Sequence, residues 1–185
     1  MLLSELAISD VTFHVSEDRE GDNNRGFRVD RIEAKRDGKV IGYIQVSYIP
    51  SERFKKFYTS LEQYTRHIAG GHPPSEDPET RKRQERAFRD FEHYHVDKPF
   101  VEFIRVMDEI DGADRSYRRQ GLGLELYKQM FKYLKRRGLK LYASNLQSDE
   151  AKAAWDKMEK IFVVKREMFR VHRKDVERRY LAALR

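Results

Sequence analysis

The sequence predicts an α/β protein with a mixed, mostly antiparallel central sheet flanked by helices. Two apolar runs, 27–35 and 40–49, are joined by Asp37-Gly38, a pair that favours a hairpin because it tolerates positive φ. A later run, 100–110, has apolar residues on both faces, as a central strand requires. Elsewhere, apolar residues recur every three or four positions, a spacing typical of helices.

The amino-terminal half supplies most of the predicted sheet. A short alternating stretch near 6–15 predicts a strand before the hairpin, and Pro50 ends the second hairpin strand. We expect a helix from Ser51 to about Ala69 and a second, highly charged surface helix from Glu79 to Tyr94. These helices form an insertion, 51–96, between the hairpin and the central strand.

A glycine-containing loop follows the central strand and opens an amphipathic helix that runs to about Arg137, where Gly138 is a plausible stop. We treat the chain, 1–185, as one domain whose core is 99–160. The remaining expected elements are a short buried strand at 139–144, a helix from Ser148 to about Lys160, one or two strands at 161–171 and a terminal helix at 173–184.

The composition suits a globular protein in water, with 39% hydrophobic and 37% charged residues. No run approaches the roughly 18 apolar residues of a membrane span, and the start "MLLSELAISD" lacks the basic region of a signal peptide. We therefore expect a cytoplasmic protein. The absence of cysteine excludes disulfides, thiol chemistry and cysteine metal sites, and we expect no metal.

Positive charge is concentrated in one part of the chain. The net charge is +7, and 115–140 alone holds nine Lys or Arg against a single acid, Glu125. The preceding stretch, 99–114, holds five acids and one base. Such focused charge favours a compact, multiply charged anion as ligand. An alternative is a nucleic-acid-binding module that uses 115–140 and 165–185 as one basic stripe.

The run Arg118–Gly123, "RRQGLG", lies where a strand gives way to a helix. A helix start leaves four backbone N–H groups unpaired, and glycine lets an anion approach them closely. The run is not a P-loop, because one residue instead of four separates its glycines. It is not the dinucleotide fingerprint either, because Leu126 stands where the third glycine belongs.

This arginine-x-x-glycine-x-glycine run resembles the signature of the GNAT superfamily of acyl-CoA-dependent N-acyltransferases. The order of strand, loop, helix, short strand and helix over 100–158 is similar as well. The resemblance implies acetyl-CoA as co-substrate and backbone contacts to its pantetheine arm and carbonyl from Val106, Met107 and Asp108. It also implies that its pyrophosphate is bound by Arg118, Arg119, Gln120, Gly121, Leu122, Gly123 and Leu124.

Members of this superfamily often use a Glu on or near the central strand as general base, and a tyrosine on the second helix to protonate the leaving thiolate. The candidates for the base here are Glu102, Asp108 and Glu109. Trp155 occupies the usual tyrosine position, and an indole is no acid at neutral pH. Tyr142 or Tyr117, or solvent, would then protonate the sulfur.

The resemblance implies transfer of an acetyl group to a primary amine on a small molecule, a protein or an aminoacyl-tRNA. The insertion 51–96 is expected to form the wall of the acceptor site. Trp155 leaves a second alternative open, a non-catalytic protein that binds CoA or a partner on the same scaffold. A homodimer is compatible with the sequence, and no membrane contact is expected.

Overall fold

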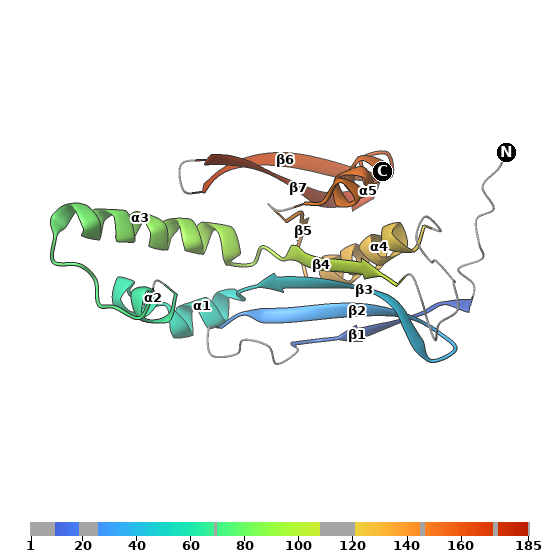
Figure 1. The fold of residues 1–185 in the computed structure, drawn as a ribbon, viewed down its shortest axis with the longest axis horizontal. Helices are drawn as coiled ribbons and strands as arrows, with labels where there is room; N and C mark the ends of the chain where they lie inside the picture. The colour runs from blue at the N-terminus through green and yellow to red at the C-terminus, as the bar shows by residue number, and fades with distance from the viewer. Residues whose placement is uncertain are drawn as a thin grey trace.

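The computed structural model describes residues 10–18, 26–68, 70–107, 121–144, 147–171 and 174–184. These parts of the chain form five helices and a seven-stranded mixed sheet of order β1-β2-β3-β4-β5-β7-β6 (Figure 1). The antiparallel half comprises β1 (Thr12–Ser16), β2 (Arg28–Arg36), β3 (Lys39–Tyr48) and β4 (Phe100–Val106). The α/β class and the mostly antiparallel sheet are therefore confirmed.

The hairpin between β2 and β3 turns at Asp37 and Gly38, whose φ angles are 50° and 76°. Both values lie in the left-handed region that this turn needs, which explains why the sequence pair predicts it correctly. The register shifts between Ala34 and Lys35, so one strand carries an extra residue close to the turn.

The main core lies between one face of the sheet and the helices α4 (Leu122–Arg136) and α5 (Asp149–Met158). Gly42 of β3 makes this packing possible. A Cβ atom at Gly42 would lie 2.9 Å from the carbonyl oxygen of Arg105 and 3.3 Å from Cδ2 of Leu122. Glycine at this position therefore lets α4 approach the sheet closely.

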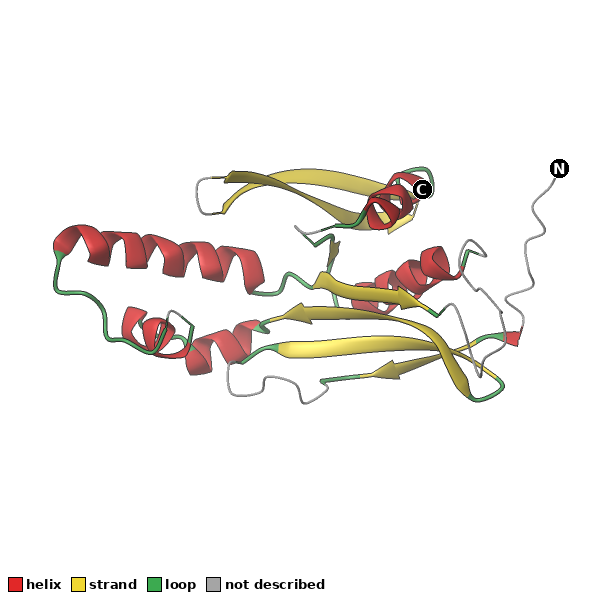
Figure 2. Ribbon diagram, viewed as in Figure 1, coloured by secondary structure: helices red, strands yellow, loops and turns green. Residues whose placement is uncertain are grey.

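The insertion forms three helices, α1 (Ser51–Phe57), α2 (Leu61–His67) and α3 (Pro78–His95). The single helix expected over 51–69 is broken because Ser60 starts a new helix, accepting a hydrogen bond from the Gln63 N–H at 3.3 Å. Figure 2 shows that the three helices extend the molecule beyond one end of the sheet instead of covering its face.

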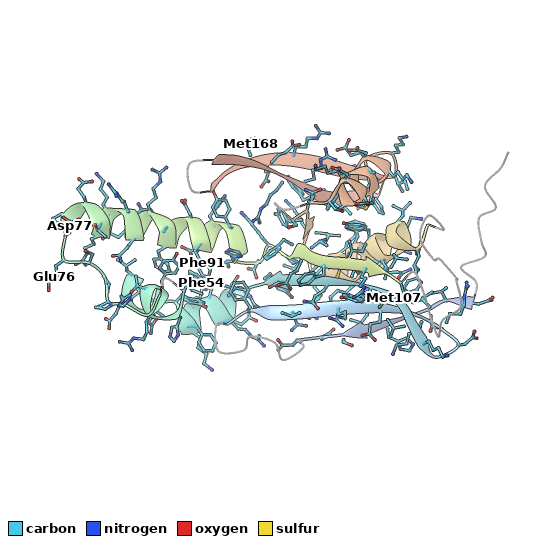
Figure 3. All side chains as sticks on the ribbon, in the orientation of Figure 1. Phe54, Glu76, Asp77, Phe91, Met107 and Met168 are labelled. Carbon is cyan, nitrogen blue, oxygen red and sulfur yellow. The ribbon has the colours of Figure 1, made fainter. Side chains whose placement is uncertain are left out.

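A second, aromatic core holds the insertion together. Phe54 of α1 and Phe91 of α3 point toward each other, with ring centroids 6.5 Å apart (Figure 3). The other buried members are Ile49, Tyr58 and Tyr64. Helix α3 is therefore exposed on most of its surface, as expected, but contributes to a core through Phe91.

The helix predicted at 173–184 is wrong. This segment is the strand β7 (Lys174–Leu184), which pairs with β6 (Phe162–Val171) and with the short strand β5 (Leu141–Tyr142). The "LAAL" end favours a helix by intrinsic propensity. Pairing on both edges overrides that preference, because Tyr180 packs on Tyr142 while Leu181 enters the main core.

Candidate active site

The parallel strands β4 and β5 separate immediately after they meet. Within the described residues their register contains one pair, Phe100 with Tyr142, and the Tyr142 N–H donates to the carbonyl of Pro99 at 2.8 Å. Strand β4 continues to Val106, whereas β5 is held from its other side by β7. The edge of β4 that faces β5 therefore has backbone groups without a strand partner in the described part of the chain.

Helix α4 begins beside this opening, at Gly121. Gly121 has φ 83° and ψ −6°, a conformation that favours glycine, and as the residue before the first turn it brings no side chain that could cap the helix. Its carbonyl accepts the N–H of Glu125 at 3.0 Å, so the helix is regular from its first turn. The first N–H groups and the positive end of the helix dipole are thus available to an anion.

Gly123 stands in the first turn of α4 for a reason other than packing. Among the described residues, a Cβ atom there would meet one neighbour at 4.0 Å, Cγ2 of Val106, and none closer. Alanine would therefore fit and would stabilise the helix by about 0.5–1 kcal/mol. Glycine at such a position is consistent with a ligand that needs the space above the helix start.

The other expected cofactor contacts are only partly described. The side chain of Leu122 is buried on the core-facing side of α4, and that of Leu124 is half-buried. Val106 of β4 packs against the main core. The Met107 N–H donates to the carbonyl of Ile41 at 2.9 Å, so this group is directed to β3 and not to the opening. Asp108, Glu109, Tyr117, Arg118, Arg119 and Gln120 lie outside the described residues.

Glu102 occupies a bulge in β4. Gln45 pairs with Phe103 and Val46 pairs with Val101, so Glu102 has no partner in the register. A bulge redirects a side chain, and here the Glu102 carboxylate accepts a hydrogen bond from Nε2 of Gln45 at 2.8 Å. The remaining face of Glu102 is exposed to solvent.

The orientation of the Gln45 amide follows from Arg31 on β2. Arg31 donates to Oε1 of Gln45 through Nε at 3.1 Å and Nη2 at 2.8 Å, and its guanidinium lies 4.2 Å from the centre of the Tyr43 ring. Because a guanidinium only donates, the amide oxygen must face Arg31 and the NH2 group must face Glu102. We call this hydrogen-bonded series the Arg31–Gln45–Glu102 chain.

Sequence reasoning named Glu102 as a candidate base but did not include Arg31 or Gln45. Both are polar residues inside apolar strand runs, and this is the one feature of the sequence that could have drawn attention to them. Aligning them across three strands requires the register shifts at Ala34/Lys35 and Gln45/Val46, and no sequence pattern reveals these shifts.

Tyr142 lies on the same face of the sheet as Glu102. Its partner Phe100 is two residues before Glu102, so Tyr142 lies about 7 Å along the strand direction and one strand spacing, about 4.8 Å, across from Glu102. The Tyr142 ring is buried against Tyr180 at 5.4 Å, and this burial raises the pKa of Tyr142 to about 12. The phenol therefore remains protonated at neutral pH and can donate a hydrogen bond.

Trp155 belongs to the opposite face. It is fully buried in the main core and packs edge-on against Tyr127 of α4, with ring centroids 5.7 Å apart. Burial raises the pKa of Tyr127 to about 12, and the neighbouring Trp155 opposes part of this rise. Trp155 thus ties α5 to α4.

The insertion and the β6–β7 hairpin meet near Tyr142. Arg178 of β7 is buried between the rings of Tyr94 and Phe100, each 5.7 Å from its guanidinium carbon. Its Nη1 donates to the Tyr94 carbonyl at 3.4 Å, and burial lowers the pKa of Arg178. Helix α3, part of the insertion expected to form an acceptor wall, therefore reaches the edge of the candidate site through Tyr94.

The described residues hold no group of three or more His, Asp or Glu arranged to bind a metal ion. Among the helices of the described ranges, none combines the length and apolarity needed to cross a membrane.

Comparison with known proteins agrees with this geometry. A search of curated proteins found no match. The model of the acetyltransferase (GNAT) family matches residues 5–159, which include the opening between β4 and β5, the start of α4 and the insertion. Since this match covers most of the chain, the protein belongs to the acetyltransferase (GNAT) family, whose members are acyl-CoA-dependent.

Proposed function

We propose that this protein transfers an acetyl group from acetyl-CoA to a primary amine. The observation that carries the proposal is the opening of β4 from β5 beside the uncapped start of α4. The first N–H groups of α4 would bind the pyrophosphate, together with Arg118, Arg119 and Gln120. The exposed edge of β4 would pair with the amides of the pantetheine arm, as an added strand does.

In this proposal Glu102 is the general base. The amine nitrogen attacks the thioester carbonyl carbon, Glu102 takes the proton from that nitrogen directly or through water, and the carbon–sulfur bond then breaks. The hydrogen bond from Gln45 holds the carboxylate at the bulge, and Arg31 holds Gln45. Tyr142, Tyr117 or solvent would give the leaving thiolate a proton, so that CoA departs as the thiol. Asp108 and Glu109 remain alternative bases.

Turnover of a panel of primary amines with acetyl-CoA, followed by release of free CoA thiol, tests the proposal. We expect CoA release with at least one amine, and a loss of about 100-fold or more in kcat for Glu102→Gln. The acetyl-CoA dissociation constant of this variant should not change. Full activity in Glu102→Gln would move the role of base to Asp108 or Glu109.

The core position of Trp155 favours one second candidate, a protein that binds CoA without turnover. Tight acetyl-CoA binding without CoA release across the panel would support it.

The nucleic-acid alternative is weakened because several basic residues are paired within the chain. Arg137 pairs with Glu17 at 3.2 Å, Lys128 with Glu125 at 3.3 Å and Arg179 with Asp156 at 2.6 Å.

A further inference from the structure

A cavity of about 470 Å³ lies in the insertion, between α1 and α3. Helix α3 contributes one stripe of residues four positions apart, and α1 contributes the facing positions and the turn after it. The lining residues are Ser51, Phe54, Lys55, Tyr58, Thr59, Phe88, Glu92 and Val96.

The wall of this cavity is aromatic. Phe54 and Tyr58 are buried, and Phe88 is half-buried. The rings of Phe54 and Phe88 are 6.0 Å apart and inclined by only 19°, so they stack on each other and leave their edges and outer faces to the cavity. Such faces favour a flat apolar group, because aromatic rings pack well in offset stacks.

Two of the polar lining residues already have partners. Asp97 accepts hydrogen bonds from the backbone N–H of Ser51 at 3.1 Å and from its hydroxyl. The hydroxyl of Thr59 donates to Oε1 of Gln63 at 2.7 Å. These groups shape the cavity but have little capacity left for a ligand.

Lys55 and Glu92 differ from them. Both are exposed at the rim of the same cavity, one on α1 and one on α3. They form no ion pair with each other, and none within the described part of the chain. Two opposite charges that share one cavity without pairing are available to a ligand that carries both charges.

The cavity is separate from the opening between β4 and β5. Val96, at its inner end, bridges to Ile49, which is four residues along β3 from Gln45. Four residues of strand span about 13 Å. Glu92 and Phe88 lie one and two helical turns farther out on α3, so a ligand in the cavity would not touch Glu102.

We propose that this cavity binds a free aromatic amino acid as a second ligand of the protein. The ring of the ligand lies against Phe54 and Phe88, its ammonium group pairs with Glu92, and its carboxylate pairs with Lys55. The proposal does not depend on acetyl transfer, because the cavity is separate from the candidate active site and binding to it can be measured without acetyl-CoA.

Titration of the ¹⁵N-labelled protein with L-phenylalanine, followed by NMR, tests this inference. We expect saturable shifts of the amide signals of 51–59 and 88–96, with a dissociation constant of about 1 mM or tighter. 2-Phenylethylamine lacks the carboxylate and 3-phenylpropionate lacks the ammonium group, so each should bind at least about fivefold more weakly. Equal binding of all three, or shifts that map elsewhere, would overturn the proposal.

Variants test which group of the ligand each of the two charged side chains binds. Lys55→Met should remove the preference for L-phenylalanine over the amine, and Glu92→Gln should remove its preference over the acid. Lys56→Met and Glu52→Gln are matched controls, because both residues are exposed on α1 but do not line the cavity. If the controls weaken binding as much as the cavity variants, the recognition is nonspecific charge attraction and the proposal fails.

Discussion

The two ends of α4 are built differently. At the carboxyl end, the Tyr133 hydroxyl donates to the buried carboxylate of Asp30 at 3.0 Å, and Arg137 pairs with Glu17 at 3.2 Å. At the amino end, Gly121 brings no capping side chain, and a Cβ atom there would meet no atom of the described residues within 4 Å. The difference teaches that hydrogen bonds and an ion pair fix the carboxyl end of α4 to the sheet, whereas the amino end is held by the buried Leu122 and carries a bare glycine where the proposed ligand would bind.

We expect the largest effect from a variant that removes the contacts at the carboxyl end of α4. Asp30 is fully buried and accepts hydrogen bonds from the Asp18 N–H, Arg28, Tyr48 and Tyr133. Asp30→Ala leaves the Arg28 charge without its buried partner, so we expect a loss of about 3–5 kcal/mol in the free energy of unfolding. Urea denaturation measures this loss.

The exposed carboxylate of Asp149 provides the control for this experiment. It pairs only with Lys152 on the same helix in the described chain, so Asp149→Ala should cost less than about 1 kcal/mol. The folded Asp30→Ala protein should bind acetyl-CoA within about twofold of wild type. A loss below about 1 kcal/mol, or a large loss of affinity, would contradict the division of roles.

Acid should weaken a region that neither end of α4 contacts, the aromatic core of the insertion. The His95 ring lies against Phe91 and Phe27 at 4.9 and 5.6 Å, and burial, with a contribution from Arg178, lowers the pKa of His95 to about 4. An unfolded histidine titrates near 6.5. Below that pH the unfolded chain binds a proton that the folded protein does not, so stability falls.

This loss should begin near pH 6.5 and reach up to about 3 kcal/mol near pH 4. Urea denaturation over this range should show a shallower fall in His95→Phe than in wild type. His72→Phe, at an exposed position, should follow wild type. Identical pH profiles for all three proteins would exclude His95 as the cause.

A smaller effect concerns the contact beneath the open end of α4. In Gly42→Ala the new methyl group would lie too close to the Arg105 carbonyl and to Leu122, so strand and helix must move apart. We expect a loss of about 1–3 kcal/mol in stability, together with weaker acetyl-CoA binding, measured by denaturation and calorimetry. Unchanged affinity would mean that the position of α4 does not control the site.

The smallest expected effect on folding is that of Gln45→Leu, which interrupts the Arg31–Gln45–Glu102 chain. We expect kcat to fall about tenfold, because the base is less well held, while the acetyl-CoA dissociation constant remains unchanged. Gln63→Leu, in the insertion, is the control. If Gln45→Leu lowers activity as much in the Glu102→Gln background as in wild type, Gln45 does not act through Glu102.

Much of this fold could be predicted from local signals. The pair Asp37-Gly38 sets the hairpin, and Gly138 ends α4 in the left-handed conformation with φ 72°. Strand β7 could not be predicted from local signals, because its pairing with β5 and β6 is a long-range contact that overrides helix propensity. The same limit applies to the site. Glu102 is recognisable by type and position, whereas Gln45 reaches it only through a bulge.

Calorimetric titration of acetyl-CoA into three proteins tests the central claim most directly. Gly121 and Gly138 stand at opposite ends of α4 with φ of 83° and 72°, and in the part of the chain that the structure describes neither has an atom within 4 Å of its missing Cβ. Gly121→Trp and Gly138→Trp therefore impose similar backbone strain. We predict that wild type and Gly138→Trp bind acetyl-CoA while folded Gly121→Trp does not. Equal binding by all three, or no binding by wild type, would contradict the claim that the amino end of α4 is the acetyl-CoA site.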